Sequence, residues 1–370
     1  MLKNKICSKH VEFILCTLVL FLINLTFTGC STQSLSVISN HYTKLLSPLS
    51  KGGGGGEIAV MQAVESKNPI TGICYQDQTN SLFTVDSKDG ILMRWDVDSG
   101  DIETSSDINI HSFSTLQFIE DCNKLFGAKQ VEFRSGRANI VVEYIDDVHL
   151  WDTLTSEVIR CWGRCDEDVQ GDPIQIGAII DESGEKRIDY YDSGYSLTEG
   201  FLLSKSVFVR GIEETSPTVG QIVFSPSSTK FVIAYLEGGI RINDNRWIKK
   251  NSSNDKHKVV ELVIDPTEKY IARIQDHYLT VWKVGVFSKQ EIVHTKLGEE
   301  NQIIFDKSGQ FMFVGGQGHI QIWDMTQNQM IHEVLAKGIS SMTISDDNRL
   351  LVWGDEYGNI HFWGLKESEE

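Results

Sequence analysis

Short apolar strands and polar turns alternate along most of the chain, and the alternation repeats. Four segments share one plan: an apolar strand, a polar turn, a second apolar strand, another turn, and a third strand that ends near a Trp. These segments are residues 222–244, 262–283, 303–324 and 342–364. The matching third-strand positions are 39, 41 and 40 residues apart, at Asn243, Trp282, Trp323 and Trp363. Alternation over such short runs predicts β-strands, and a fixed period predicts a repeat architecture.

Two earlier segments extend the repeat, one over residues 73–96 and a weaker one from about Ser114 to Asp152. A period near 40 residues, with three strands and a final Trp-Asp, resembles the WD40 repeats, which form β-propellers. The Trp-Asp pair stands at 95–96, 151–152 and 323–324, but no repeat opens with the usual Gly-His pair. The resemblance covers residues 57–370. It implies a divergent bacterial propeller, all-β, without the hydrogen-bond network that His, Ser, Trp and Asp form in that family.

The length of the repeat region predicts the number of blades. Residues 57–370 number 314, which is about 45 per blade for a seven-bladed β-propeller. We expect residues 131–147 to be an extra hairpin in the second blade, and residues 57–64 to supply the outer strand of the last blade, which closes the ring. The first strands of the blades are expected to begin near Ile70, Ser114, Pro173, Val219, Val259, Asn301 and Ile339.

Residues 1–29 have the pattern of a lipoprotein signal peptide. A positively charged start precedes an apolar run over residues 13–27, which is too short to span a bilayer. The small residues Thr28 and Gly29 directly before Cys30 resemble the bacterial lipobox, in which the Cys is lipidated and becomes the first residue. Phe27 departs from the aliphatic residue usual in that motif. The alternatives are an uncleaved signal anchor and cleavage by ordinary signal peptidase. Ser31, rather than Asp, resembles the outer-membrane sorting pattern.

A polar stretch and five consecutive glycines follow, so residues 30–56 are predicted to be a lipidated Cys and a flexible tether. A coil of this length has a root-mean-square span of roughly 28 Å. The alternative is that residues 41–49 form a short docked helix. The predicted organisation is therefore a signal peptide over 1–29, a tether over 30–56 and a propeller over 57–370.

Net charge bears on the class of partner, and the cysteine residues bear on possible disulfides. The chain carries 34 Lys+Arg and 51 Asp+Glu, a net charge of −17, which argues against nucleic acid as the main partner. An oxidising periplasm would permit a small loop disulfide between Cys161 and Cys165. Cys74 and Cys122 fall near the ends of two predicted first strands, where we expect two packed thiols rather than a bridge.

Candidate catalytic chemistry is sparse. His149, His319 and His361 each precede a Trp by two or four residues, and the repeated position predicts a structural role in packing. The sequence has no H-E-x-x-H, no G-x-S-x-G and no closely spaced His pair. Polar residues of the first strands are mainly Ser, Thr, Gln and Asn, with the single acid Glu261. The sequence thus predicts no metal, no cofactor and no enzymatic activity.

One basic segment stands out against the acidic composition. It lies within residues 245–258, where the outer strand of the fourth blade and the loop to the fifth are expected. The segment is either a solvated loop or a contact for an anionic surface such as lipid headgroups, with its aromatic residue at the interface. The residues concerned are Arg246, Trp247, Lys249, Lys250, Lys256 and Lys258.

These features predict a lipid-anchored propeller that faces the periplasm, most simply from the outer membrane, and acts as a monomeric protein-interaction scaffold. Its partners would be envelope proteins, bound by loops displayed on the ring. The resemblance extends loosely to propeller lipoproteins that assist outer-membrane protein assembly, although those carry a different repeat. The alternatives are a propeller enzyme of the hydrolase or lactonase kind, and a binder of a glycan or small ligand at the mouth of the channel.

Overall fold

The computed structural model describes most of the repeat region, and the described residues form strands and turns. The predicted signal peptide and nearly all of the tether, including Cys30, lie outside the described residues. The structure describes residues 56–62, 68–86, 88–108, 113, 115–134, 141–163, 172–174, 177–181, 186–191, 194–199, 206–210, 219–242, 246–249, 257–285, 289–298, 302–316, 318–346, 348 and 350–364.

Most of the sheets are antiparallel meanders of four strands that follow one another in the chain. The first consists of β2 (Gly72–Gln76), β3 (Ser81–Asp86), β4 (Ile91–Asp96) and β5 (Ile102–Asp107). Another consists of β11 (Gly177–Ile180), β12 (Lys186–Tyr191), β13 (Gly194–Glu199) and β14 (Ser206–Arg210). The next consists of β15 (Val219–Phe224), β16 (Phe231–Tyr235), β17 (Ile240–Ile242) and β18 (Arg246–Lys249).

Two further meanders follow the same plan. One consists of β19 (Val259–Ile264), β20 (Tyr270–Gln275), β21 (Tyr278–Val284) and β22 (Lys289–Lys296). The other consists of β23 (Gln302–Phe305), β24 (Phe311–Gly315), β25 (His319–Asp324) and β26 (Gln329–Leu335). Five of the predicted first strands begin within one residue of their expected positions, which were near Ser114, Val219, Val259, Asn301 and Ile339.

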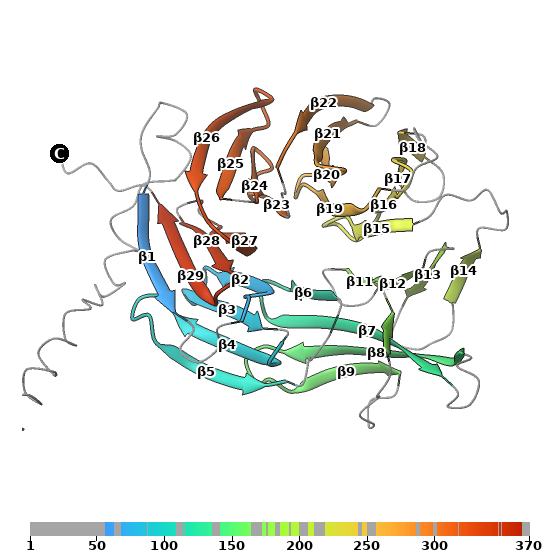
Figure 1. Cartoon of the computed structure of the whole chain (residues 1–370), viewed down its shortest axis with the longest axis horizontal. Helices are drawn as coiled ribbons and strands as arrows, with labels where there is room; N and C mark the ends of the chain where they lie inside the picture. Colours follow the sequence, from blue (N-terminus) through green and yellow to red (C-terminus); the bar gives the residue numbers. More distant parts are fainter. Residues whose placement is uncertain are drawn as a thin grey trace, which may run out of the picture.

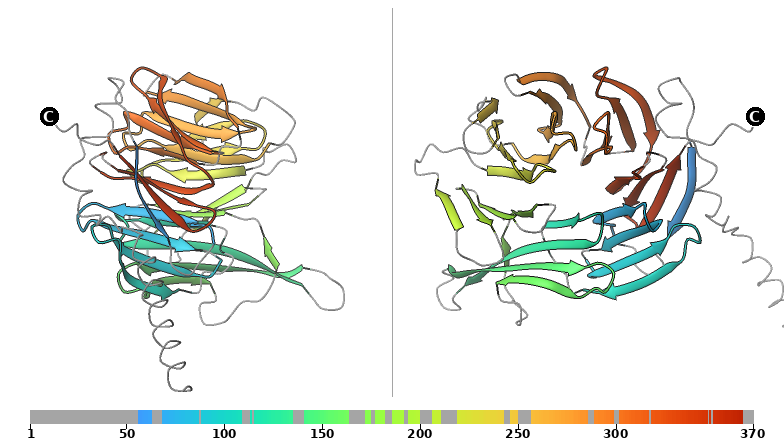
Figure 2. Two further views of the ribbon diagram at one scale, coloured as in Figure 1. Left: turned by 60° about the vertical axis from the view of Figure 1, so that its left-hand side comes forward. Right: turned by 180° about the vertical axis from the view of Figure 1, so that it is seen from behind.

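The sheet after β5 is larger than the others, and it corrects one sequence-based expectation. It consists of β6 (Thr115–Ile119), β7 (Lys124–Arg134), β8 (Val141–Asp152), β9 (Val158–Gly163) and the short β10 (Asp172–Ile174). Residues 131–147 form a hairpin in this sheet, as expected, but the hairpin is the continuation of β7 and β8, which stay paired out to Arg134 and Val141. Pro173 does not begin the next inner strand. It lies in β10, which pairs with β7, and the next inner strand is β11. The long β7–β8 hairpin projects from the body of the molecule (Figure 2).

The last sheet joins the two ends of the described chain. It contains β27 (Ile339–Ile344), β28 (Leu350–Asp355) and β29 (Asn359–Gly364), with β1 (Gly56–Gln62) paired antiparallel to β29. The sheets are arranged around a centre (Figure 1). Their first strands contact one another in the circular order β2, β6, β11, β15, β19, β23, β27 and back to β2. This circular order of meanders defines an all-β β-propeller with the first strands innermost.

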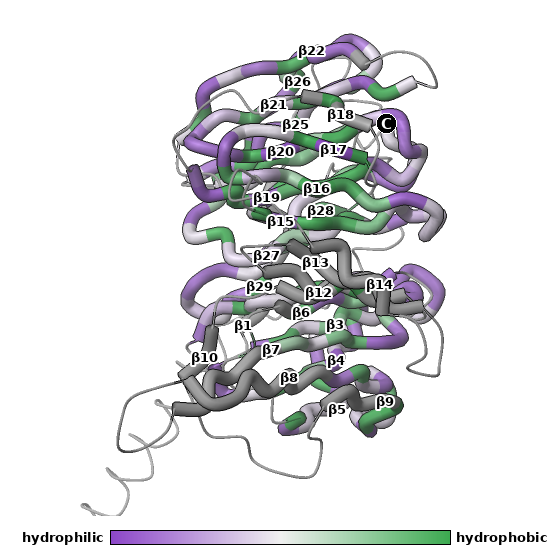
Figure 3. The backbone as a smooth tube through the Cα atoms, turned by 90° about the vertical axis from the view of Figure 1, so that its right-hand side faces the viewer, coloured by the Kyte–Doolittle hydropathy of each residue, from purple (hydrophilic) through white to green (hydrophobic). Residues whose placement is uncertain are grey.

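Burial explains why the repeats alternate as they do. The second strands β3, β20, β24 and β28 are buried at every position, whereas β5, an outermost strand, is mainly exposed. Both faces of each sheet pack against a neighbouring sheet, so strands near the centre are apolar on both sides. One such core joins Trp95 and Leu82 of the first sheet to Val352 and Phe362 of the last. Hydrophobic colour follows the inner strands and polar colour the turns in the described parts of the tube (Figure 3).

The Trp residues at the third-strand ends belong to these cores. Trp95 and Trp151 are each 1% exposed. Trp95 donates from its indole N–H to the Thr84 hydroxyl, at 2.9 Å. A large aromatic ring at this point fills the space between neighbouring sheets, and its one polar atom is satisfied inside.

Candidate functional site

The turns between first and second strands lie on one face of the ring, and we call them the inner turns. Each of four inner turns begins with a Ser or Asp that is at most 2% exposed. The side-chain oxygen of this residue accepts a hydrogen bond from the backbone N–H five positions later in the chain. These turn-capping residues are Ser225, Asp265, Asp306 and Ser345. Their carboxylates and hydroxyls therefore fix the backbone of the turns.

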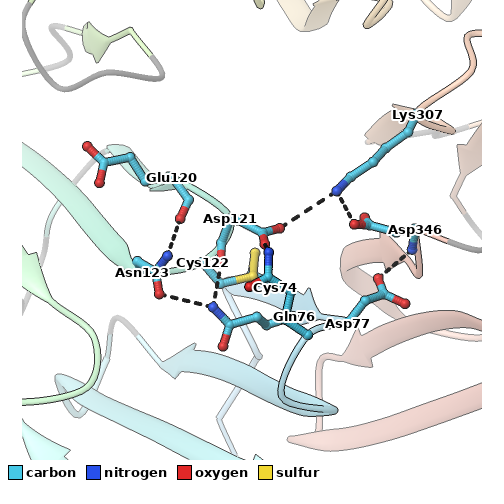
Figure 4. Close-up of polar contacts among 10 residues, drawn as sticks. Cys74, Gln76, Asp77, Glu120, Asp121, Cys122, Asn123, Lys307 and Asp346 are labelled. Atoms are coloured by element: carbon cyan, nitrogen blue, oxygen red, sulfur yellow. Dashed lines mark hydrogen bonds and ion pairs between the residues drawn. A yellow bond between two sulfur atoms is a disulfide. The ribbon is translucent and has the colours of Figure 1, made fainter.

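A lysine on one inner turn reaches across to the turns of other sheets (Figure 4). Lys307, between β23 and β24, forms ion pairs with Asp346, between β27 and β28, and with Asp121, between β6 and β7, at 3.7 Å to the latter. Asp77, between β2 and β3, accepts a hydrogen bond from the backbone N–H of Asp346. Four sheets thus meet in one polar group, which we call the mouth cluster: Asp77, Asp121, Lys307 and Asp346.

The electrostatics of the mouth cluster favour the charged form of its lysine. Partial burial alone would lower the pKa of Lys307. The hydrogen bond to Asp346 and the negative charges of Asp346, Asp121 and Asp77 outweigh this effect, so the pKa lies above its usual value. The side chain of Lys307 is 59% exposed, so solvent screens its ion pairs. These ion pairs therefore orient the side chains on the inner turns, and they contribute little to the stability of the fold.

A disulfide lies beside the mouth cluster and corrects the expectation of two packed thiols. Cys74 on β2 is bonded to Cys122, with Cα atoms 5.8 Å apart. The sequence placed Cys122 near the end of a first strand, but it lies in the turn after β6. There the residues Glu120, Asp121 and Cys122 have φ values of 51°, 55° and 66°. This left-handed run bends the turn inward and brings Cys122, 1% exposed, against β2.

Polar side chains from two directions hold the same turn. Gln76 donates from its amide N–H₂ to the carbonyl of Asp121 and to the side-chain oxygen of Asn123, both at 3.0 Å. Thr153, which follows β8, donates its hydroxyl to the carbonyl of Cys122 at 2.7 Å. The turn from Glu120 to Asn123 is therefore bonded to the first sheet and to its own sheet at once. Figure 4 shows the first of these sets of contacts beside the disulfide.

Polar residues on the inner strands also tie one sheet to the next. Gln302 on β23 donates to the Ser340 carbonyl on β27 at 2.8 Å, and Gln117 on β6 donates to the Ile180 carbonyl on β11 at 3.3 Å. These are the Gln residues that the sequence placed on the first strands. Their amides connect backbone across neighbouring sheets, which is a structural use of the polar lining.

Glu261 is the exception among these inner-strand residues. Burial raises its pKa to about 8, although hydrogen bonds from the Leu262 backbone and the Gln221 side chain partly oppose the shift. Gln221 lies on β15 and Glu261 on β19, and these are neighbouring inner strands. The amide oxygen of Gln221 is buried with no hydrogen-bond partner. A protonated Glu261 carboxyl supplies an O–H group at this position, which a carboxylate would not.

The structure brings few of the sequence-predicted site residues together. Cys30, Cys165, Lys250 and Lys256 lie outside the described residues, so the lipidation site and the Cys161–Cys165 pair remain predictions. Cys161 lies on β9. Arg246, Trp247 and Lys249 lie on β18, the outermost strand expected there, and exposed Lys258 directly precedes β19.

The three His residues near Trp side chains contact their own sheets. The His149 ring lies edge-on to Trp151, with centroids 5.1 Å apart, and the His361 ring stacks on Trp353 at 5.0 Å. His319 is 3.6 Å from a carboxylate oxygen of Glu333 on the adjacent strand. Within the described ranges, no group of three His, Cys, Asp or Glu residues is placed to hold a metal ion. No helix in the same ranges is long and apolar enough to cross a membrane.

The repeats and the ring of sheets define the chain as a WD40-like β-propeller. No protein-family profile matches it. Over 182 residues it is 23% identical to the target of rapamycin complex subunit wat1 of Schizosaccharomyces pombe, a match that covers 47% of this chain and 58% of that protein. The chain thus spans little more than half the length of that curated relative.

A solved structure is similar over a greater length. The β-propeller domain of Cps50 (Swd1) from Myceliophteria thermophila superposes with a TM-score of 0.63 and 12% sequence identity. The superposition covers 85% of this chain and all of that domain. At this identity the similarity shows the fold alone. The mouth cluster and the disulfide were not predicted from the sequence, because their residues come from parts of the chain that are distant from one another and share no motif.

Proposed function

We propose that the protein is a protein-interaction scaffold in the bacterial cell envelope. The observation that carries this proposal is the WD40-like ring, in which buried caps and inter-sheet ties hold the turns in place. Such a ring presents many turns on a rigid body, and function then lies in the turns. The S. pombe relative is named as a subunit of a protein complex, which supports a role in assembly with other proteins.

We further propose a seven-bladed ring that is closed by the N-terminal strand. The circular order of inner strands supports seven blades, and the pairing of β1 with β29 supports closure between the two chain ends. In this arrangement β1 is the outer strand of the last blade, contributed by the start of the folded region. Closure of this kind leaves no gap between the first and last blades.

The proposed location is the periplasmic side of the outer membrane, with a lipid anchor on Cys30. Support comes from the apolar run before Thr28, Gly29 and Cys30, and from Ser31 after it. The disulfide between Cys74 and Cys122 adds independent support, because such bonds persist in oxidising compartments and are rare in the cytosol. The basic segment of β18 and the following loop is proposed as a contact for lipid headgroups.

We propose a binding role rather than an enzymatic one. The polar inner-strand residues Gln117 and Gln302 bond to backbone carbonyls of neighbouring sheets, so their amides are already engaged. Elemental analysis of the purified full chain tests this assignment. A stoichiometric transition metal held by the protein would favour the alternative of a propeller enzyme.

Affinity purification after cross-linking in cells tests the scaffold role. The full chain with an affinity tag and a matched Cys30→Ala variant would be compared. Recovery of the same envelope proteins in stoichiometric amounts with the anchored protein, and their loss with the variant, is the expected outcome. Recovery of no protein above the background of an untagged strain would contradict the scaffold role.

A further inference from the structure

The turn between β6 and β7 has a backbone that its counterparts do not share. Glu120, Asp121 and Cys122 are three consecutive non-Gly residues with left-handed φ. Among the described residues of the other inner turns, four turns have a single non-Gly residue with left-handed φ, and a fifth turn has Gly309 there. The four non-Gly residues are Asn80, Ser228, Glu268 and Asn348. Left-handed φ is unfavourable for a residue with a Cβ atom, and a run of three persists only where its surroundings hold it.

The contacts that hold this turn differ in kind. Gln76 and Thr153 hold it by hydrogen bonds, and these are present whatever the redox conditions. The bond between Cys74 and Cys122 is covalent, but it exists only in the oxidised protein. Cys122 is buried, whereas Cys74 keeps some exposure. The disulfide is therefore the strongest contact that holds the turn, and it is also the one that reduction removes.

The position of Asp121 depends on the left-handed run formed by Glu120, Asp121 and Cys122. Asp121 is the middle residue of this run. Its carboxylate forms an ion pair with Lys307, which lies on the turn between β23 and β24. The other partner, Asp346, lies on a turn whose single left-handed residue is Asn348 and which carries no disulfide among the described residues. Relaxation of the β6–β7 turn would therefore separate Lys307 from Asp121 and leave the ion pair with Asp346 in place.

We propose that the Cys74–Cys122 disulfide is a redox-controlled catch for the mouth cluster. In the oxidised protein it holds Asp121 against Lys307, which links the sheet of β23–β26 to the sheet of β6–β10 across this end of the ring. In the reduced protein the β6–β7 turn relaxes and that link is lost. This inference concerns the conformation of one turn, and it stands whether or not the proposed partners and location are correct.

The redox step requires a dithiol reductant. One of its thiolates attacks the Cys74 sulfur, the Cys74–Cys122 bond breaks, and Cys122 leaves as a thiolate that takes up a proton. The second thiol of the reductant then resolves the mixed disulfide. Two electrons and two protons pass to the protein, which ends with two thiols, while the reductant becomes a disulfide.

Zero-length cross-linking of amines to carboxylates measures how often Lys307 and Asp121 lie in contact. The full chain would be treated with a carbodiimide with and without prior dithiothreitol, and the cross-linked peptides would be quantified by mass spectrometry. The yield of the Lys307–Asp121 cross-link, relative to the Lys307–Asp346 cross-link, is expected to fall severalfold on reduction. The second cross-link is an internal reference, because it shares the same amine. An unchanged ratio in protein shown to be reduced would overturn the proposal.

Hydrogen exchange of the same samples shows whether the disulfide stabilises only the β6–β7 turn or the whole ring. Amides of residues 115–125 are expected to exchange about tenfold faster after reduction, because local opening becomes easier. Residues 222–232, which carry the equivalent β15–β16 turn, are expected to be unchanged. Equal acceleration in both segments, or none in either, would contradict a local catch.

Matched cysteine variants complete the test. Cys74→Ser/Cys122→Ser should show the low cross-link ratio and the fast exchange of residues 115–125 without any reductant. Cys161→Ser/Cys165→Ser should behave like the unaltered protein before and after reduction. If the first variant does not fold, the comparison of oxidised and reduced unaltered protein still decides the question.

Discussion

At the scale of single residues, Glu261, half-buried on the inner strand β19, links one side chain to the response of the whole ring to pH. Its folded-state pKa is about 8, against an ordinary value of 4.5. The folded protein therefore keeps a proton that the unfolded chain releases. The free energy of unfolding should fall as pH rises from about 4.5 to about 8, because the unfolded state binds fewer protons across this window.

Replacing Glu261 with its neutral isostere should remove this dependence. Glu261→Gln is expected to raise the free energy of unfolding at pH 8 by on the order of 1–3 kcal/mol, and to change it little at pH 4. Urea unfolding at the two pH values measures the difference. A variant with the same pH slope as the unaltered protein would show that Glu261 ionises normally in the fold.

The capping residue Asp306 gives a second prediction at this scale. Asp306 is 0% exposed, and its carboxylate accepts hydrogen bonds from the Phe311 N–H at 2.8 Å and the Asn348 amide at 3.1 Å. Asp306→Ala should lower the free energy of unfolding by about 2–3 kcal/mol, because buried donors lose their acceptor. The exposed turn residue Asp101 is the matched control, and Asp101→Ala should change stability by less than about 0.5 kcal/mol. Equal effects in the two variants would argue against the capping role.

At the scale of elements, predictability followed the strength of the alternation. The sheets over residues 219–364 were anticipated closely, because their strands are apolar, their turns are short and their third strands repeat. The region around Pro173 was misassigned, because β7 and β8 are unusually long and β10 adds to the edge of their sheet. Nothing in the residues 120–123 indicates a left-handed run, since no Gly is present, so the disulfide and mouth cluster could not be inferred from the sequence.

The strand β1 provides the prediction at this scale. A chain that begins at Lys67 lacks β1 and leaves β29 with unpaired backbone groups along one edge. It should melt at a lower temperature than a chain that begins at Gly52, and it should self-associate, because exposed edges pair with other chains. Thermal unfolding and light scattering compare the two. A Lys67 chain that stays monomeric with an unchanged melting temperature would contradict ring closure by β1.

At the scale of the whole molecule, the proposed anchor decides where the ring is displayed. Cys30→Ala should abolish fatty-acid labelling and move the protein out of the membrane fraction, because a lipidated Cys is the proposed attachment. Cys16→Ala, within the apolar run, is the control and should leave both properties intact. Labelling that persists in Cys30→Ala would exclude this residue as the lipidation site.

The antiparallel pairing of β1 with β29 has a consequence for orientation. Gly56 lies opposite Gly364, so the chain enters the ring and leaves it at the same end of the same sheet. That end of β29 is on the side of the β27–β28 turn, since β29 runs in the same direction as β27. The proposed tether would therefore join the ring on the face that carries the inner turns. If the proposed lipid anchor on Cys30 is correct, the opposite face of the ring, with the turns between second and third strands, would point away from the membrane and be open to large partners.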